Sequence, residues 1–115
     1  MTRVKRGKIK VKKRKKLLKL TKGFKWGRKS KPKRAKEAIL KALTYAYRDR
    51  KKKKSEFRKL WQIQIGNAAK ERGLSYSKFI HLLKEKNIEL DRKILAQIAI
   101  NYPDIFSKII EKVKS

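Results

Sequence analysis

The sequence lacks most of the side chains from which enzyme active sites and metal centres are built. It has no cysteine, a single histidine and only 9 Asp or Glu among 115 residues. Without cysteine the chain has no disulfide, no thiolate metal site and no thiol nucleophile. No paired acids, no nucleophile beside a base and no set of metal ligands stand out. We therefore expect a protein that is not an enzyme, with no catalytic residues, no metal and no cofactor.

Long hydrophobic runs are missing as well. No stretch of 18 apolar residues occurs, so no segment is expected to span a membrane. The apolar cluster nearest the start, Leu17, Leu18 and Leu20, is too short for the core of a signal peptide. The basic first part also lacks the broad apolar face of a membrane-active peptide.

Positive charge is what the sequence has in excess. Its 38 Lys and Arg give a formal net charge of +29, and repulsion at this density opposes compaction. The chain is therefore expected to bind a polyanion, with nucleic acid as the first candidate. Residues 1–58 carry a net +24 and residues 59–115 a net +5. We predict a basic extension over 1–58 and a globular helical domain over 59–115.

The first twenty residues have almost no acid and almost no core-forming side chains. Alone in water they are expected to be disordered, because they bury too little apolar surface to offset the loss of chain entropy. Residues 12–16 are five consecutive cations, and residues 10–20 are expected to become helical once phosphates screen their repulsion. The alternative is a tail that stays solvated.

Residues 21–33 contain glycines and a proline, which predict a bend or loop. Phe24 and Trp26 lie within it, flanked by Gly23, Gly27 and several cations. Aromatic rings of this kind stack on unpaired bases while neighbouring cations bind phosphates. The alternative is a small hydrophobic latch onto the next helix.

A long helix is predicted from about Pro32 to Arg72, ended by Gly73, because apolar residues recur at helical spacing before and after a basic middle. A kink or break near Lys51–Ser55 is the alternative.

The basic middle of this helix begins with Tyr45, Tyr47, Arg48, Asp49 and Arg50. The two tyrosines point to roughly opposite sides, so one ring is expected to pack inward. Cations on nearly every side suggest nucleic acid on more than one side. The plainer interpretation of Asp49 is an i, i+4 surface bridge to residue 53, and both can hold.

The C-terminal half is predicted to form short helices over residues 76–86, 92–101 and 104–114, without strands. Ser75 and Asp91 are the expected N-caps, and Pro103 opens the last helix. With residues 57–69 these helices form a small bundle, whose core is expected to hold Phe57, Trp61 and Phe79. The fold class is therefore all-α: an extended basic arm and one long helix leading into a small C-terminal bundle.

Six blocks of sequence carry a resemblance to a known family: Arg3-Val4-Lys5-Arg6-Gly7, Lys22-Gly23-Phe24, Tyr45-Ala46-Tyr47-Arg48-Asp49-Arg50, Phe57-Arg58-Lys59-Leu60-Trp61, Ser75-Tyr76-Ser77-Lys78-Phe79-Ile80 and Asp91-Arg92-Lys93-Ile94-Leu95-Ala96. In this order and spacing they are similar to ribosomal protein twenty of the bacterial large subunit, over nearly the whole chain. The resemblance implies an N-terminal extension threaded through large-subunit ribosomal RNA, a globular C-terminal domain on the outer side of the subunit, and an early role in subunit assembly.

The resemblance also implies the partners: large-subunit ribosomal RNA, neighbouring ribosomal proteins and, as in some members, the chain's own messenger RNA. It implies no membrane partner, no homo-oligomer, and a place on the ribosome in the cytoplasm or in an organelle. The chain departs from the family where Gln64-Ile65-Gly66 stands for the common Arg-Ile-Asn. A cation and an amide are missing there, and glycine weakens a helix by about 1 kcal/mol relative to alanine.

The candidate RNA-binding residues are cationic or aromatic residues that lie in these blocks, in the arm or in the loop that follows it. Stacking contacts are assigned to Phe24 and Trp26. Phosphate contacts are assigned to Arg3, Lys5, Arg6, Lys12, Lys13, Arg14, Lys15, Lys22, Arg28, Arg48, Arg50 and Arg58. The alternative function is a basic architectural protein that compacts DNA, which composition alone allows. The loop of aromatics and glycines favours unpaired RNA.

Overall fold

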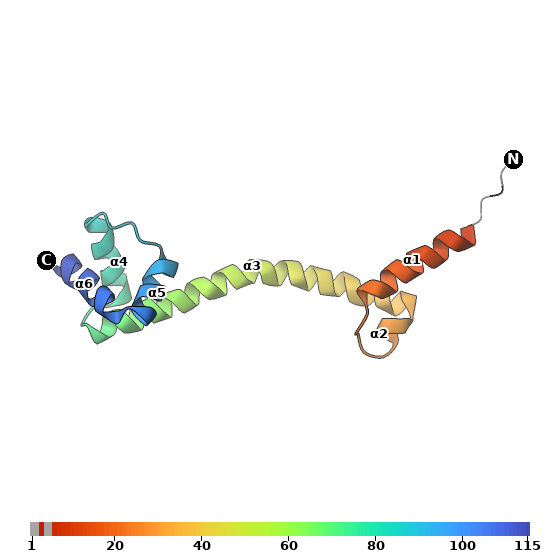
Figure 1. Ribbon diagram of the computed structural model, residues 1–115, viewed down its shortest axis with the longest axis horizontal. Coiled ribbons are helices and arrows are strands. Elements are labelled where there is room, and N and C mark those ends of the chain that lie inside the picture. Colours follow the sequence, from red (N-terminus) through yellow and green to blue (C-terminus); the bar gives the residue numbers. More distant parts are fainter. Residues whose placement is uncertain (1–2, 4–5) are drawn as a thin grey trace. The chain divides into compact units, whose positions relative to one another are not determined.

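The computed structural model describes residue 3 and residues 6–115, which form six helices and no strand. Figure 1 shows them in chain order: α1 (Arg6–Leu20), α2 (Gly27–Ser30), α3 (Pro32–Glu71), α4 (Tyr76–Glu85), α5 (Arg92–Asn101) and α6 (Pro103–Lys114). The all-α prediction is confirmed. The chain divides into two compact units, one ending at Lys51 and the other running over Lys52–Ser115. A functional boundary after residue 58 stays a prediction.

Helix α3 begins and ends close to where its sequence predicts. The Lys31 carbonyl accepts the first helical hydrogen bond, from the Ala35 amide at 2.9 Å, so Lys31 occupies the N-cap position before Pro32. At the other end Gly73 has a φ of 79°, and the Leu74 amide donates to the Ala69 carbonyl at 3.0 Å. This is a Schellman-type end, which requires a left-handed residue. The helical assignment has no break over residues 51–55.

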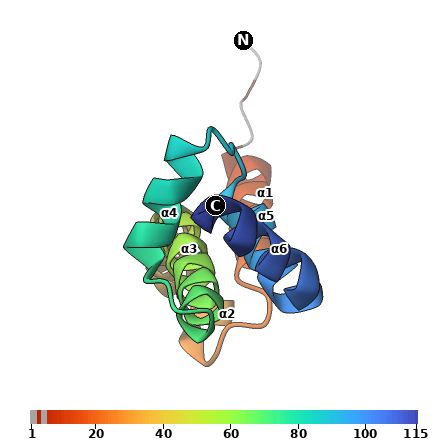
Figure 2. The same ribbon diagram turned by 90° about the vertical axis from the view of Figure 1, so that its left-hand side faces the viewer.

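The core of the C-terminal unit joins α3 to the three short helices. Figures 1 and 2 show α4, α5 and α6 gathered around the C-terminal end of α3. Phe79 and Phe106 are fully buried, with ring centroids 5.4 Å apart. The remaining buried core residues are Ile65, Ala69, Leu74, Leu83, Leu95, Ala96, Ile110 and Val113. The prediction of a small helical bundle is confirmed, with Phe79 at its centre.

The two other aromatics predicted for this core behave differently. Trp61 is only partly buried against the core, and Phe57 is 44% exposed, so its assignment to the core is wrong. The apolar stripe of α3 continues beyond the turns that the short helices cover. Helical periodicity marks the face that is apolar, but it does not mark where the neighbouring helices stop covering it.

Caps and a bridging arginine fix the ends of the helices in this unit. The Ser75 hydroxyl accepts from the Lys78 amide at 3.4 Å, as expected of an N-cap. Asp91 occupies the N-cap position of α5, but its carboxylate makes no capping bond. Its carbonyl accepts from the Leu95 amide instead. Arg72 joins the end of α3 to α6, because its guanidinium donates to Ser107 Oγ at 2.7 Å.

The N-terminal unit contains a longer helix than the sequence predicted. Helix α1 begins at Arg6, four residues before the expected start at Lys10, and none of its residues is buried. Lys and Arg are good helix formers because their straight side chains lose little freedom in a helix. Inside the predicted loop over 21–33, residues Gly27–Ser30 form the single turn α2. Disorder of the arm in water, without a polyanion, stays a prediction.

Two glycines of the C-terminal unit lead to opposite predictions for stability. Gly66 lies inside α3, where an added Cβ would meet the Cβ of Tyr76 at 3.6 Å, an ordinary contact. Gly66→Ala should therefore raise the free energy of unfolding by about 1 kcal/mol. Gly73→Ala should lower it by about 1 kcal/mol, because alanine is strained at a φ of 79°. Urea denaturation measures the free energy of unfolding of both variants. A change of the same sign in the two variants would contradict the prediction.

Candidate nucleic-acid interface

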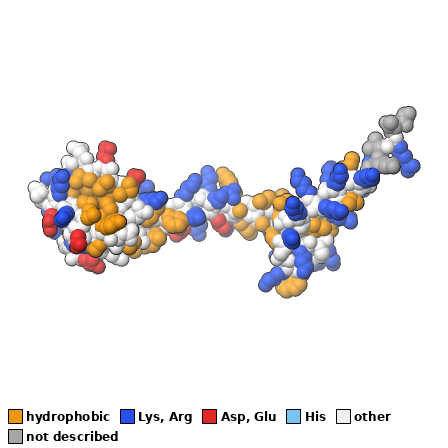
Figure 3. Space-filling model, viewed as in Figure 1, with side chains coloured by type: hydrophobic (Ala, Val, Ile, Leu, Met, Phe, Trp, Pro, Cys, Tyr) orange, Lys and Arg blue, Asp and Glu red, His pale blue; other side chains and the backbone are white. Residues whose placement is uncertain are grey.

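Helix α1 presents its cations on every side. All residues from Arg6 to Lys16 are exposed, and five consecutive cations at positions 12–16 turn through more than a full helical turn. Figure 3 shows blue side chains spread over this helix. Arg3 is exposed too, and Lys5 lies outside the described residues. A helix of this kind can meet phosphates from several directions at once, as the candidate residues Arg6, Lys12, Lys13, Arg14 and Lys15 require.

The loop after α1 holds one aromatic ring inward and the other outward. Phe24 is partly buried, and its amide donates to the Thr21 carbonyl at 3.0 Å. Trp26 is 84% exposed and has a φ of 54°, a region that non-glycine residues rarely enter. Strain of this kind is often found at functional sites. The latch interpretation therefore fits Phe24, and the base-stacking interpretation fits Trp26.

A groove of about 580 Å³ lies between this loop and the first part of α3. Three aromatic residues line it, namely Phe24, Trp26 and Tyr45. Its cations come from both sides, and they are Lys25, Arg28, Arg34 and Lys41. The structure thus brings Arg28 and both predicted stacking residues together with Tyr45. Sequence reasoning missed Arg34 and Lys41, which lie seven residues, about two helical turns, apart on the same face of α3.

The two tyrosines in the basic middle of α3 both face solvent. Tyr45 is 53% and Tyr47 59% exposed, so the expectation that one packs inward is wrong. Each ring instead lies under a cation: the Arg48 guanidinium is 4.8 Å from the Tyr45 centroid, and Lys51 Nζ is 5.4 Å from the Tyr47 centroid. Both rings therefore stay on the surface, each beside a cation of the same helix.

Asp49 pairs with its neighbour rather than with residue 53. Arg48 Nε donates to Asp49 Oδ1 at 2.9 Å. This hydrogen bond, together with the charge of the carboxylate, raises the pKa of Arg48 above its ordinary value. The hydrogen bond orients the Arg48 side chain on the helix surface, and the guanidinium is charged at neutral pH with or without it. Arg50 and, in the other unit, Arg58 are exposed.

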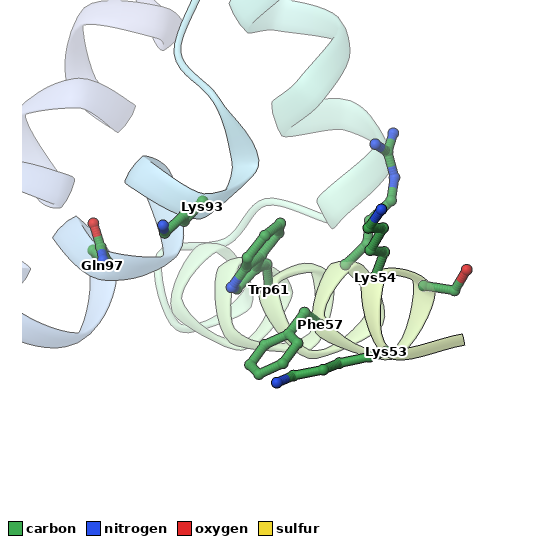
Figure 4. A pocket seen from close by; sticks show the side chains of 8 residues that line it. Lys53, Lys54, Phe57, Trp61, Lys93 and Gln97 are labelled. Atoms are coloured by element: carbon green, nitrogen blue, oxygen red, sulfur yellow. The ribbon is translucent and has the colours of Figure 1, made fainter. Parts of the chain in front are cut away.

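A second groove lies within the C-terminal unit, between α3 and α5, and is here called the Trp61 groove. It has a volume of about 750 Å³ and is lined by Lys53, Lys54, Ser55, Phe57, Arg58, Trp61, Lys93 and Gln97. Figure 4 shows Trp61 and Phe57 side by side on α3, with Lys93 and Gln97 across from them on α5. Of these residues only Arg58 was predicted from the sequence. Lys53 and Lys54 belong to the basic middle of α3, which was expected to face nucleic acid, and both aromatic residues had been assigned to the core. Lys93 and Gln97 had no assigned role.

Other kinds of site find no support in the part of the chain that is described. No three His, Asp or Glu side chains of residues 3 and 6–115 lie close enough to hold a metal ion together. None of the described helices is both long enough and apolar enough to cross a membrane.

The sequence was also compared with known proteins. Residues 3–109 match the family model described as ribosomal protein L20. The chain is 53% identical, over 99% of its length, to the large ribosomal subunit protein bL20 of Leptospira biflexa, covering 97% of that protein. It is 49% identical over its full length to the protein of the same name from a Picosynechococcus species, covering 99% of it. The Thermomicrobium roseum protein of that name is 48% identical over 96% of this chain and 95% of its own length.

Proposed function

Because the chain belongs to the ribosomal protein L20 family, whose members are structural and non-enzymatic components of the large ribosomal subunit, we propose that it binds large-subunit ribosomal RNA and promotes assembly of the subunit. The observation that carries this proposal is that every cation on α1 is exposed. No protein surface in the described chain neutralises them, and each cation that meets a phosphate releases counterions and so favours binding.

The two units have different parts in this function. The N-terminal unit supplies exposed cations on α1 and on α3, together with the aromatic groove around Trp26. RNA segments that approach one another can be held together by such an element, because it offers charge on all sides. The C-terminal unit has its own buried core and provides a folded anchor. The extension would then settle among RNA strands while the anchor fixes its position.

Comparison of two nucleic acids tests this function directly. The full chain is titrated with a large-subunit ribosomal RNA fragment and with duplex DNA of equal length at about 0.2 M salt, where purely electrostatic binding is weakened. We expect clearly tighter binding to the RNA, because unpaired bases can stack on the exposed Trp26 ring. Equal affinities would favour the DNA-compacting alternative.

Arg48 and Arg50 provide a local test of the phosphate contacts. The double variant Arg48→Ala with Arg50→Ala should weaken binding to the ribosomal RNA fragment and reduce the slope of log affinity against log salt by about two. Thermal stability should be unchanged, because both side chains are exposed. The matched control removes Lys108 and Lys112, two exposed cations of α6. A large loss of stability in the arginine variant would assign these residues to the fold instead.

A further inference from the structure

We propose that the Trp61 groove binds an unpaired RNA base together with its phosphate. The proposal rests on the proposed function in one respect, namely that the ligand of the chain is RNA. It adds a base-binding site in the C-terminal unit, which is otherwise assigned only the part of an anchor. The groove volume of about 750 Å³ lies within the range of roughly 300–1,000 Å³ typical of sites for small ligands.

The floor of the groove is aromatic surface that the core does not use. The rings of Phe57 and Trp61 are one helical turn apart on α3, with centroids 6.3 Å apart and planes inclined by 39°. The core itself is completed one and two turns further on, where Ile65 and Ala69 are fully buried. Phe57 remains 44% exposed. An exposed ring beside a half-buried indole is a surface on which a planar base stacks favourably.

The rim of the groove carries the charge that a nucleotide requires. Four cations line it, from both helices, and they are Lys53, Lys54, Arg58 and Lys93. No Asp or Glu is among the lining residues. Lys53 Nζ lies over the Phe57 ring, 5.7 Å from its centroid, so one cation is held within reach of the phosphate of a base stacked in the groove. Aromatic rings surrounded only by positive charge complement a base attached to a phosphate, and a basic partner would be repelled.

Gln97 supplies the remaining polar group. It stands on α5 across the groove from Trp61, beside Lys93 (Figure 4). Its amide offers both a hydrogen-bond donor and an acceptor, the combination that pairs with the edge of adenine. A base stacked on either ring would lie in the groove that Gln97 also lines, where its edge can reach the amide. Adenine is therefore the base with which the site is best tested.

Fluorescence of Trp61 in the full chain tests the proposal. The reference protein carries Trp26→Phe, which leaves Trp61 as its single tryptophan. It is titrated with a short oligoadenylate and with an abasic oligonucleotide of the same length, which has the same phosphates but no bases. We expect quenching of Trp61 by oligoadenylate and little change with the abasic strand. Phe57→Ala in the same background should weaken the quenching titration by roughly 5- to 150-fold, the range for loss of one stacked base.

The matched control is Ile63→Ala, which truncates an exposed apolar side chain of α3 that does not line the groove. It should leave the titration unchanged. Gln97→Ala changes an exposed position outside the core and should also weaken binding of oligoadenylate. It replaces Phe57→Ala as the test variant if Phe57→Ala fails to fold. Equal responses to the two oligonucleotides, or equal effects of Phe57→Ala and Ile63→Ala, would overturn the proposal.

The unmodified chain, which keeps Trp26, is titrated separately with the ribosomal RNA fragment and with duplex DNA. If it binds this fragment tightly while Trp61 does not distinguish oligoadenylate from the abasic strand, the base site is wrong and the ribosomal RNA function stands. If the fragment is not bound in preference to duplex DNA, the proposed function fails, whatever the response of Trp61. The two failures are therefore distinguishable.

Discussion

Replacing the five consecutive cations of α1 with glutamine is expected to reduce affinity for a ribosomal RNA fragment by about a thousandfold at 0.1 M salt. The residues are Lys12, Lys13, Arg14, Lys15 and Lys16. Each phosphate contact that is lost removes close to one released counterion, so the slope of log affinity against log salt should fall by about four. Glutamine has nearly the helix propensity of lysine, and none of these positions is buried. The loss would therefore reflect charge rather than unfolding.

The control for this variant changes the same number of charges elsewhere. Five exposed lysines of the C-terminal unit are replaced by glutamine, namely Lys78, Lys84, Lys86, Lys108 and Lys112. Affinity is measured by fluorescence anisotropy over a range of salt concentrations. A loss in the control as large as that in the α1 variant would show that total charge matters and that the position of the charge on α1 does not.

Phe106→Ala is expected to abolish the cooperative unfolding transition of the C-terminal unit. The Phe106 ring is fully buried, contacts Phe79 and lies 5.5 Å from the Arg72 guanidinium carbon. Truncating a buried phenylalanine costs about 3–5 kcal/mol, and a core this small rarely supplies more than roughly 3–5 kcal/mol in total. The variant should thus show little remaining stability in urea denaturation followed by circular dichroism.

The neighbouring residue offers a close control for this effect. Ile105→Ala removes a side chain that is 49% exposed, one position along the same helix, and should change stability by no more than about 0.5 kcal/mol. A Phe106→Ala variant that is fully folded without urea and still unfolds in a sharp transition would contradict this prediction. The bundle would then not depend on the contact between α4 and α6 at this point.

The helix ends were predictable because particular residues determine them locally. Pro32, Gly73, Ser75 and Pro103 each fix backbone geometry or supply a missing hydrogen bond within a few residues. The end of α3 is a clear case, since Gly73 adopts the left-handed conformation that its sequence position indicated. Periodicity between these markers then identified the apolar faces, and Phe79 was placed correctly in the core.

What the sequence did not predict depends on how far one element covers another. Phe57 and Trp61 fit the apolar period of α3 as well as Ile65 does, but the short helices cover only the last of the three completely. The Trp61 groove was missed partly for that reason. It was missed also because its residues come from α3 and α5, which are distant in sequence. The pairing of Asp49 with Arg48 was missed since two neighbouring partners were available, and periodicity does not choose between them.

The exposure of α1 affects how easily proteases cleave copies of the chain that are not bound to RNA. A helix without a buried residue has little to hold it closed, so its backbone opens easily. Proteases that cleave after lysine or arginine would then remove the extension and leave the C-terminal bundle intact. Bound RNA would shield the same peptide bonds. Proteolysis of surplus copies would therefore leave a folded C-terminal fragment that binds RNA weakly. The lifetime of the intact chain would then depend on how much RNA is available to bind it.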